Sequence, residues 1–182
     1  MIKETITAFS LATLTIFTAA HNFNQDLPTP ARMTINEDIV RTKARYALEY
    51  LGAPSDKITC LTNAVHAGSV AAGGIDPILI ASIIKPESEF TIDAKSKKGY
   101  KGLMQTPKAT MKWNYVEADI VYGSLILRDH IKEAKGDIAK GMIHYKGHGG
   151  KESQMYAKKQ IQLYQEVKYA VNKRMKEEKR NA

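Results

Sequence analysis

The sequence contains very little cysteine. Cys60 is the only one among 182 residues, so the chain has no intramolecular disulfide and no cysteine-rich zinc site. With 43% hydrophobic and 25% charged residues, six prolines and twelve glycines, the composition also excludes collagen-like, low-complexity and wholly disordered chains. We therefore expect one globular domain that is stabilised by packing.

The sequence also lacks an apolar run near its start that is long enough to cross a bilayer. The uncharged stretch Ile6–Ala20 has 15 residues, whereas a membrane-spanning helix needs about 20. Lys3 before it, and Thr18 and Ala20 at its end, are typical of a signal peptide or of a surface anchor. We predict a signal-like or anchoring segment with a linker over residues 1–30, and a location in the cell envelope or periplasm, or alternatively in a virion.

Acidic residues are fewer than basic ones. The chain has 27 Lys and Arg against 19 Asp and Glu, a net charge of +8, which favours a polyanionic partner such as nucleic acid, acidic lipid or a cell-wall polymer. Residues 158–180 alone hold eight basic side chains and three glutamates. No nucleic-acid-binding motif accompanies this charge, so charge by itself does not choose among these partners.

Strand patterns are absent as well. No pair of segments alternates apolar and polar residues, and no repeat of 20–50 residues is present. Helical periodicity runs through most of the chain instead. The predicted helices cover residues 37–51, 57–72, 78–84, 118–134 and 138–145, followed by a long last helix with an apolar stripe over 157–175. The predicted fold class is all-α.

The helix predicted over 78–84 is apolar nearly all round, which is typical of a helix at the centre of a core. Asp76 is a good N-cap with Pro77 in the first helical position, and Pro86 is expected to kink or end the helix. Asp56 is similarly placed to cap the preceding helix. Glu87 thus follows an apolar helix, where partial desolvation favours the protonated carboxyl that a general acid needs.

Four blocks of the sequence, in the same order, resemble the soluble lytic transglycosylase family. They are Glu87-Ser88-x-Phe90, Ala94-x-Ser96-x-x-Gly99-x-x-Gly102-Leu103-Met104-Gln105, Asp119-Ile120-x-x-Gly123 and Tyr145-x-Gly147. The pairing of Glu-Ser with Gly-Leu-Met-Gln is the most specific of these features. The resemblance implies a lysozyme-like fold of the goose-type class over residues 31–182, with its motif core in 75–150.

The resemblance also implies an activity. The family cleaves the β-1,4 bond between N-acetylmuramic acid and N-acetylglucosamine of peptidoglycan, as a carbon-oxygen lyase without a cofactor or metal. Glu87 takes the place of the single catalytic glutamate. Ser96, Met104, Gln105 and Tyr145 fall where the family has residues that hold the sugar or orient that glutamate. The implied nucleophile is the sugar's own 6-hydroxyl, so the product has a 1,6-anhydro ring. A secretion, conjugation or phage assembly is a conceivable partner.

The chain departs from the family pattern in three places. Asp119 stands where the family usually has Asn, and Lys146 replaces the Asn of a usual Tyr-Asn pair. Gln105 is followed by Thr106 and Pro107 where the family has a more apolar sequence, so one wall of the groove is expected to differ. None of these changes removes a proton-transfer group.

Two other functions remain open. A hydrolytic lysozyme needs a second carboxylate ~5–9.5 Å from the first. Asp93 in the following loop is the better candidate, because Glu89 lies about 200° around a helix from Glu87. The other alternative is a non-catalytic protein that binds peptidoglycan as a scaffold.

The remaining candidate residues can be explained by structural roles alone. His144 and His148 have metal-like spacing, but Gly147 interrupts the helix, and no metal site is predicted. Cys60 is expected to be a small buried apolar residue. Aromatic and basic side chains near the proposed groove can contact sugar rings and wall peptides, or else cap the core and be solvated: Trp113, Tyr115, Lys95, Lys97, Lys98 and Lys101.

Overall fold

The computed structural model describes residues 30–106, 116–147 and 149–181, with side chains from Glu37 onward. The predictions for the N-terminal segment, Trp113, Tyr115 and His148 lie outside these residues. The chain divides into two compact units, Met1–Asn36 and Glu37–Ala182. Of the first unit only residues 30–36 are described, and they form the start of one helix. All other described residues belong to the second unit.

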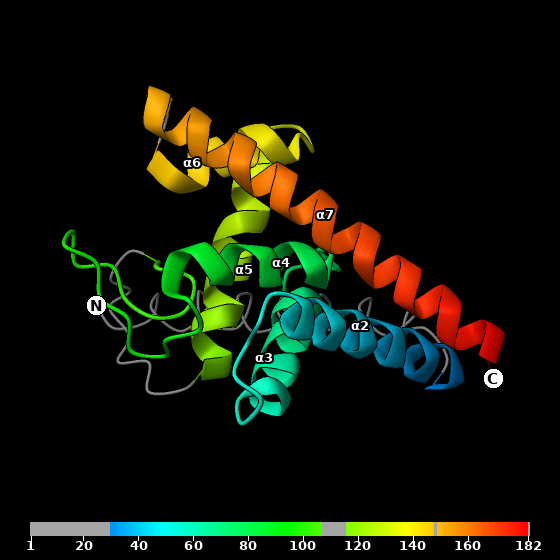
Figure 1. Cartoon of the computed structure of the whole chain (residues 1–182). Helices are drawn as coiled ribbons and strands as arrows, with labels where there is room; N and C mark the ends of the chain where they lie inside the picture. The colour runs from blue at the N-terminus through cyan, green and yellow to red at the C-terminus, as the bar shows by residue number, and fades with distance from the viewer. Residues whose placement is uncertain (1–29, 107–115, 148, 182) are drawn as a thin grey trace, which may run out of the picture. The chain divides into compact units, whose positions relative to one another are not determined.

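The described residues form six α-helices and contain no strand (Figure 1). The helices are α2 (Pro30–Tyr50), α3 (Ile58–Ala71), α4 (Pro77–Ser88), α5 (Val116–Glu133), α6 (Ile138–Gly147) and α7 (Lys151–Asn181). None of them combines the length and the hydropathy that crossing a membrane requires. The predicted all-α class with a long C-terminal helix is therefore confirmed. The observed bounds differ most from the predicted ones in α2, which begins seven residues earlier, and in α7, which extends six residues beyond the predicted apolar stripe at each end.

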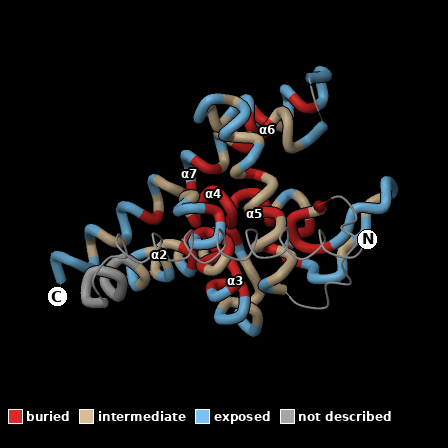
Figure 2. The backbone as a smooth tube through the Cα atoms, turned by 180° about the vertical axis from the view of Figure 1, so that it is seen from behind, coloured by how far each residue is buried: buried red, intermediate tan, exposed pale blue. Residues whose placement is uncertain are grey.

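Helix α4 is the centre of the core, as its apolar sequence predicts. All its residues from Pro77 to Ile84 are buried (Figure 2), and it packs against α3 and α7. Helix α3 in turn packs closely on α5, because a Cβ atom on Gly68 would lie 2.6 Å from Ser124 Oγ. This arrangement places the C-terminal end of α4, with Glu87, at the edge of the core.

The ends of the helices follow some of the sequence signals. The Asp76 side chain caps α4 by accepting a hydrogen bond from the Ile78 N–H at 3.1 Å, as predicted. Helix α4 continues past Pro86 to Ser88 and ends with Glu89 in the left-handed conformation, at φ 49°. The predicted Asp56 cap is wrong, since Lys57 is the N-cap of α3 and no side chain caps it.

Cys60 is exposed, so the prediction that it is buried is also wrong. It lies beside the buried stripe of α3 and one residue before Leu61, which is 1% exposed. Successive helix residues are rotated by about 100°, which turns Cys60 out of the interface.

Helix α7 packs on α4 and carries contacts to α2 along its second half. Val171 is 1% exposed, Arg174 Nη1 lies 2.6 Å from the Glu49 carboxylate, and Glu178 accepts a hydrogen bond from the Tyr46 hydroxyl. The sequence predicts that the basic tail beyond Lys173 is exposed, and its Lys and Arg residues are exposed in the structure. Arg174 and Glu178 nevertheless also bind side chains of α2.

Replacing Val171 with Asp is expected to lower the free energy of unfolding by at least about 2 kcal/mol. The substitution places a carboxylate in a buried apolar site, where it has no partner. The matched control is Asn172→Asp, which adds the same charge at an exposed position of the same helix. Chemical denaturation of both variants tests the prediction, and equal destabilisation would mean that the stripe on α7 is misassigned.

Candidate active site

A groove of about 550 Å³ lies at the C-terminal end of α4. It is bounded by the last turn of α4, the loop segment 96–105, the second half of α5, the end of α6 and the start of α7. Four of the five predicted site residues line it: Glu87, Ser96, Gln105 and Tyr145. Helix α5 lies between Glu87 and Tyr145 in the sequence, and the fold brings all four residues to one surface.

The Glu87 carboxylate is the most enclosed acidic group of this groove. Its side chain is 6% exposed, and both of its oxygens accept hydrogen bonds from Lys146 Nζ, at 3.0 and 3.1 Å. Lys146 is 36% exposed and comes from α6. The apolar helix thus buries the glutamate as predicted, while its ionic partner is the lysine at which the chain departs from the family pattern.

Two tyrosines stand close to Glu87. The Tyr145 hydroxyl donates a hydrogen bond to the Met104 carbonyl at 2.7 Å, and the ring of Tyr156 on α7 lies 4.6 Å from Lys146 Nζ. Burial, and after it the negative charge of Glu87, raises the pKa of both tyrosines. Both phenols therefore stay protonated at neutral pH and can act as hydrogen-bond donors.

Gln105 and Ser96 hold the shape of the loop that forms one wall. The Gln105 side-chain amide donates to the carbonyls of Ala94, at 3.1 Å, and Gly102, at 2.7 Å. Ser96 Oγ accepts a hydrogen bond from the Tyr100 N–H at 3.0 Å. These two side chains line the groove and at the same time fix the backbone around it.

Met104 does not line the groove. Its side chain is fully buried, and it packs so closely on α5 that a Cβ atom on Gly123 would lie 2.6 Å from its sulfur. The predicted sugar contact is therefore not open to the Met104 side chain. The residue contributes through its backbone instead, because its carbonyl accepts the hydrogen bond that holds Tyr145.

Asp119 on α5 holds the backbone of the same loop in place. Its carboxylate accepts a hydrogen bond from the Leu103 N–H at 2.5 Å. Burial raises the pKa of Asp119, and the backbone N–H groups of Leu103 and Met104 partly offset that rise. A carboxylate at this position thus binds backbone donors and supports the loop rather than the substrate.

The loop requires glycine at position 102, and Gly102→Ala is expected to destabilise the protein more than Gly99→Ala does. Both glycines have φ +83°, which costs an alanine about 1–2 kcal/mol. A Cβ atom on Gly102 would also lie 2.4 Å from the Asp119 carboxylate, whereas one on Gly99 would meet nothing within 4 Å. We expect ~1–3 kcal/mol of additional loss at Gly102. Denaturation curves measure the difference, and equal losses would show that Asp119 moves aside freely.

The carboxylates considered as partners of Glu87 lie elsewhere. Glu89 is exposed at the left-handed end of α4 and Asp93 is exposed in the loop, and neither lines the groove. Among the described residues, the second acidic side chain that does line it is Glu152, at the start of α7. Sequence spacing gave no reason to connect Glu152 with Glu87, because the fold joins the ends of two separate helices.

Comparison with known proteins identifies the domain. Residues 67–167, more than half of the chain, match the family described as "Transglycosylase SLT domain". No curated protein and no solved structure matches the chain significantly. The matched range contains every residue that lines the groove.

Proposed function

The chain belongs to the SLT transglycosylase domain family, and from this membership we propose that it is a peptidoglycan lytic transglycosylase in which Glu87 is the general acid and base. The family supports a transglycosylase-type action on peptidoglycan. The observation that carries the finer proposal is the enclosed Glu87 carboxylate at the wall of a groove, at the fixed end of the core helix α4.

The reaction needs two proton transfers at one place. Glu87 donates a proton to the glycosidic oxygen as the bond to C1 breaks, and the resulting carboxylate then accepts a proton from the sugar's 6-hydroxyl as that oxygen bonds to C1. One carboxyl suffices, because it ends the cycle protonated as it began. In this proposal the protonated phenol of Tyr156 orients Glu87 or the sugar around it, whereas Tyr145 supports the site through its hydrogen bond to the Met104 carbonyl.

The groove also suits a glycan that carries peptides. Ser96 and Gln105 present polar groups along the loop wall, and Lys97 and Lys98 line the same wall. Ammonium groups at these positions attract the carboxylates of wall peptides. Polar contacts with the sugar and basic contacts with the peptides would thus come from one loop.

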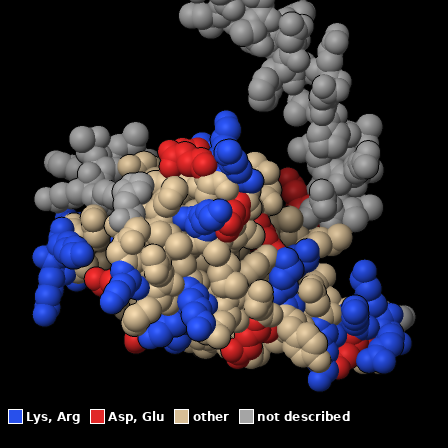
Figure 3. All heavy atoms as spheres, turned by 90° about the horizontal axis from the view of Figure 1, so that it is seen from above, with Lys and Arg blue, Asp and Glu red and all other residues tan. Residues whose placement is uncertain are grey.

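A nucleic-acid-binding function has less support. Basic and acidic side chains are interspersed on the face shown in Figure 3, and two basic residues of α7 are engaged in ion pairs, Arg174 with Glu49 and Lys168 with Asp76. These pairs reduce the charge available for phosphate contacts.

Loss of turbidity of purified murein sacculi tests the proposal. An active enzyme clears the suspension, and a scaffold protein sediments with the sacculi without clearing it. A nucleic-acid binder does neither, and instead binds DNA with a steep dependence on salt.

We also propose that the protein acts in the cell envelope, where its substrate is found. The uncharged stretch Ile6–Ala20 supports this proposal.

Replacing Lys146 with Asn is expected to raise the initial rate of cleavage about two- to fivefold. Lys146 Nζ binds both oxygens of Glu87, so the glycosidic oxygen has to displace it before proton transfer. An ion pair with a partly exposed lysine is worth up to ~1 kcal/mol, and ~1.4 kcal/mol corresponds to a tenfold change in rate. Lys140→Asn, on the same helix but away from the groove, is the control. A fall in rate for Lys146→Asn alone would instead make Lys146 a required positioning residue.

A further inference from the structure

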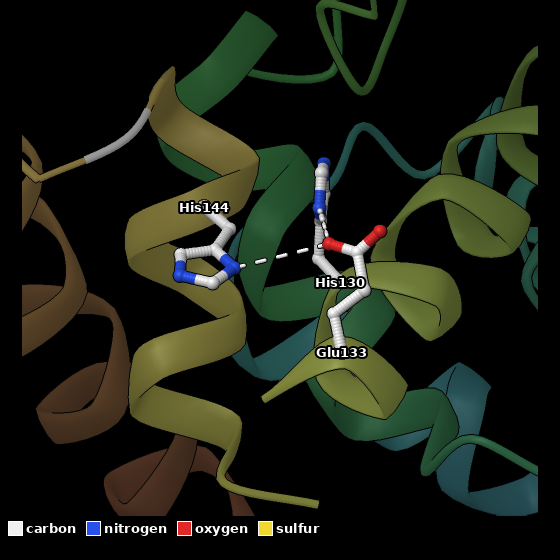
Figure 4. Close-up of side chains that lie close together, drawn as sticks. All are labelled: His130, Glu133 and His144. Carbon is white, nitrogen blue, oxygen red and sulfur yellow. Dashed lines mark hydrogen bonds and ion pairs between the residues drawn. The ribbon is translucent and has the colours of Figure 1, made fainter. Parts of the chain in front are cut away.

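A second group of chemically active side chains lies between α5 and α6. His130 and Glu133 are one helical turn apart on α5, and His144 faces them from α6 (Figure 4). The Glu133 carboxylate lies 3.2 Å from His130 Nδ1 and 3.9 Å from His144 Nδ1. One ligand atom from each of the three residues lies within 4.8 Å of the other two.

The packing of the two helices fixes this convergence. Gly141 on α6 lies against Ile131 on α5, and a Cβ atom on Gly141 would be 2.9 Å from Ile131 Cα. His144 is three residues after Gly141 and therefore on the same face of α6. Ile131 lies between His130 and Glu133 in sequence, so this close contact between the two helices is beside the cluster.

Two imidazoles and one carboxylate are a ligand set typical of zinc and similar divalent transition metals. Bond lengths of ~2.0–2.2 Å in a tetrahedral site place ligand atoms ~3.3–3.6 Å apart. The His130–Glu133 separation is already close to this range. The His144–Glu133 separation is 3.9 Å, and all three ligand atoms lie within 4.8 Å of one another. Binding therefore requires the two imidazoles and the Glu133 side chain, which is 62% exposed, to draw together around the ion.

We propose that His130, Glu133 and His144 bind one divalent transition-metal ion of the zinc type, with water completing its coordination. Sequence spacing had pointed to His144 with His148 and predicted no metal site. The structure instead pairs His144 with two residues of the preceding helix. The proposal concerns binding and does not depend on the proposed enzymatic function.

The ion would have a structural consequence for the groove. His130 lines the groove, and its ring meets that of Tyr145 edge to face, with centroids 6.5 Å apart. An ion held by α5 and α6 joins the two helices that supply this wall. Metal binding therefore stabilises the wall that carries Tyr145 and Lys146.

Calorimetric titration with zinc chloride tests the site on the full chain, prepared without a polyhistidine tag and freed of metal with a chelator. We expect one equivalent of zinc to bind and the melting temperature to rise. Glu133→Gln and His144→Ala should each weaken binding at least about tenfold. Glu133 is exposed, so Glu133→Gln provides a test even if His144→Ala fails to fold.

Two control variants keep the outcomes distinct. His148→Ala should bind zinc like the unchanged chain, because His148 is not among the proposed ligands. Glu87→Gln should also bind zinc normally, even though the proposed function predicts that it is inactive. Zinc affinity that is unchanged in Glu133→Gln and His144→Ala, or absent from the unchanged chain, would overturn the metal site and leave the proposed function untouched.

Discussion

Replacing Glu87 with Gln is expected to reduce the rate of peptidoglycan cleavage at least about 100-fold. The amide preserves the shape of the side chain but has no proton to transfer, and general acid-base catalysis typically contributes ~10²–10⁴-fold. Because the substitution removes both the proton donation and the later proton acceptance, the loss appears in kcat rather than in binding. Release of soluble muropeptides from sacculi measures the rate.

The fold should tolerate this change. Glu87 lies at the edge of the core and its partner Lys146 is 36% exposed, so the lysine remains solvated when the ion pair is lost. The variant should therefore melt near the unchanged protein and still sediment with sacculi. Glu89→Gln is the matched control, since Glu89 is a nearby exposed glutamate that does not line the groove. Retention of more than about a tenth of the activity by Glu87→Gln would remove Glu87 from its proposed role.

The sequence predicted the parts of this molecule that local chemistry determines. The apolar residues of α4 and the Asp76 cap follow from side-chain pattern and capping alone, and the structure has both. The position of Glu87 follows from the same helix, because a polar residue at the end of a buried element lies at a surface. The convergence of Ser96, Gln105 and Tyr145 on Glu87 was predicted only through the resemblance to a family.

Features that depend on contacts between distant elements were not predictable. Met104 belongs to the most specific motif, but its side chain is held in the core by the close approach of Gly123. Tyr156 and the Lys146–Glu87 ion pair come from helices whose position beside α4 no spacing rule specifies. Cys60 shows the same limit within one helix, since a residue adjacent to an apolar stripe is buried or exposed according to the width of the interface.

Cleavage is expected to yield muropeptides that end almost entirely in 1,6-anhydro sugar, each lighter by one water than the product of hydrolysis. In the proposed reaction the 6-hydroxyl attacks and no water enters. Mass spectrometry of the released fragments distinguishes the two products directly. The prediction concerns the chemistry at C1, so it can fail even if Glu87 proves essential.

Hydrolysis in place of the intramolecular reaction would require a different arrangement of acidic groups. A hydrolase with paired carboxylates needs a second acidic group on the groove, and Asp93 and Glu89 do not line it, whereas Glu152 does. Asp93→Asn and Glu152→Gln should therefore each cost less than about tenfold in rate, far below the loss of ~10²–10⁴-fold expected when an acid-base group is removed. Reducing-end muropeptides as the main product, together with a large loss of activity in Glu152→Gln, would make this protein a two-carboxylate lysozyme. Anhydro products with little effect at either position leave Glu87 as the single acid and base, because no other acidic side chain of the groove among the described residues would then be required.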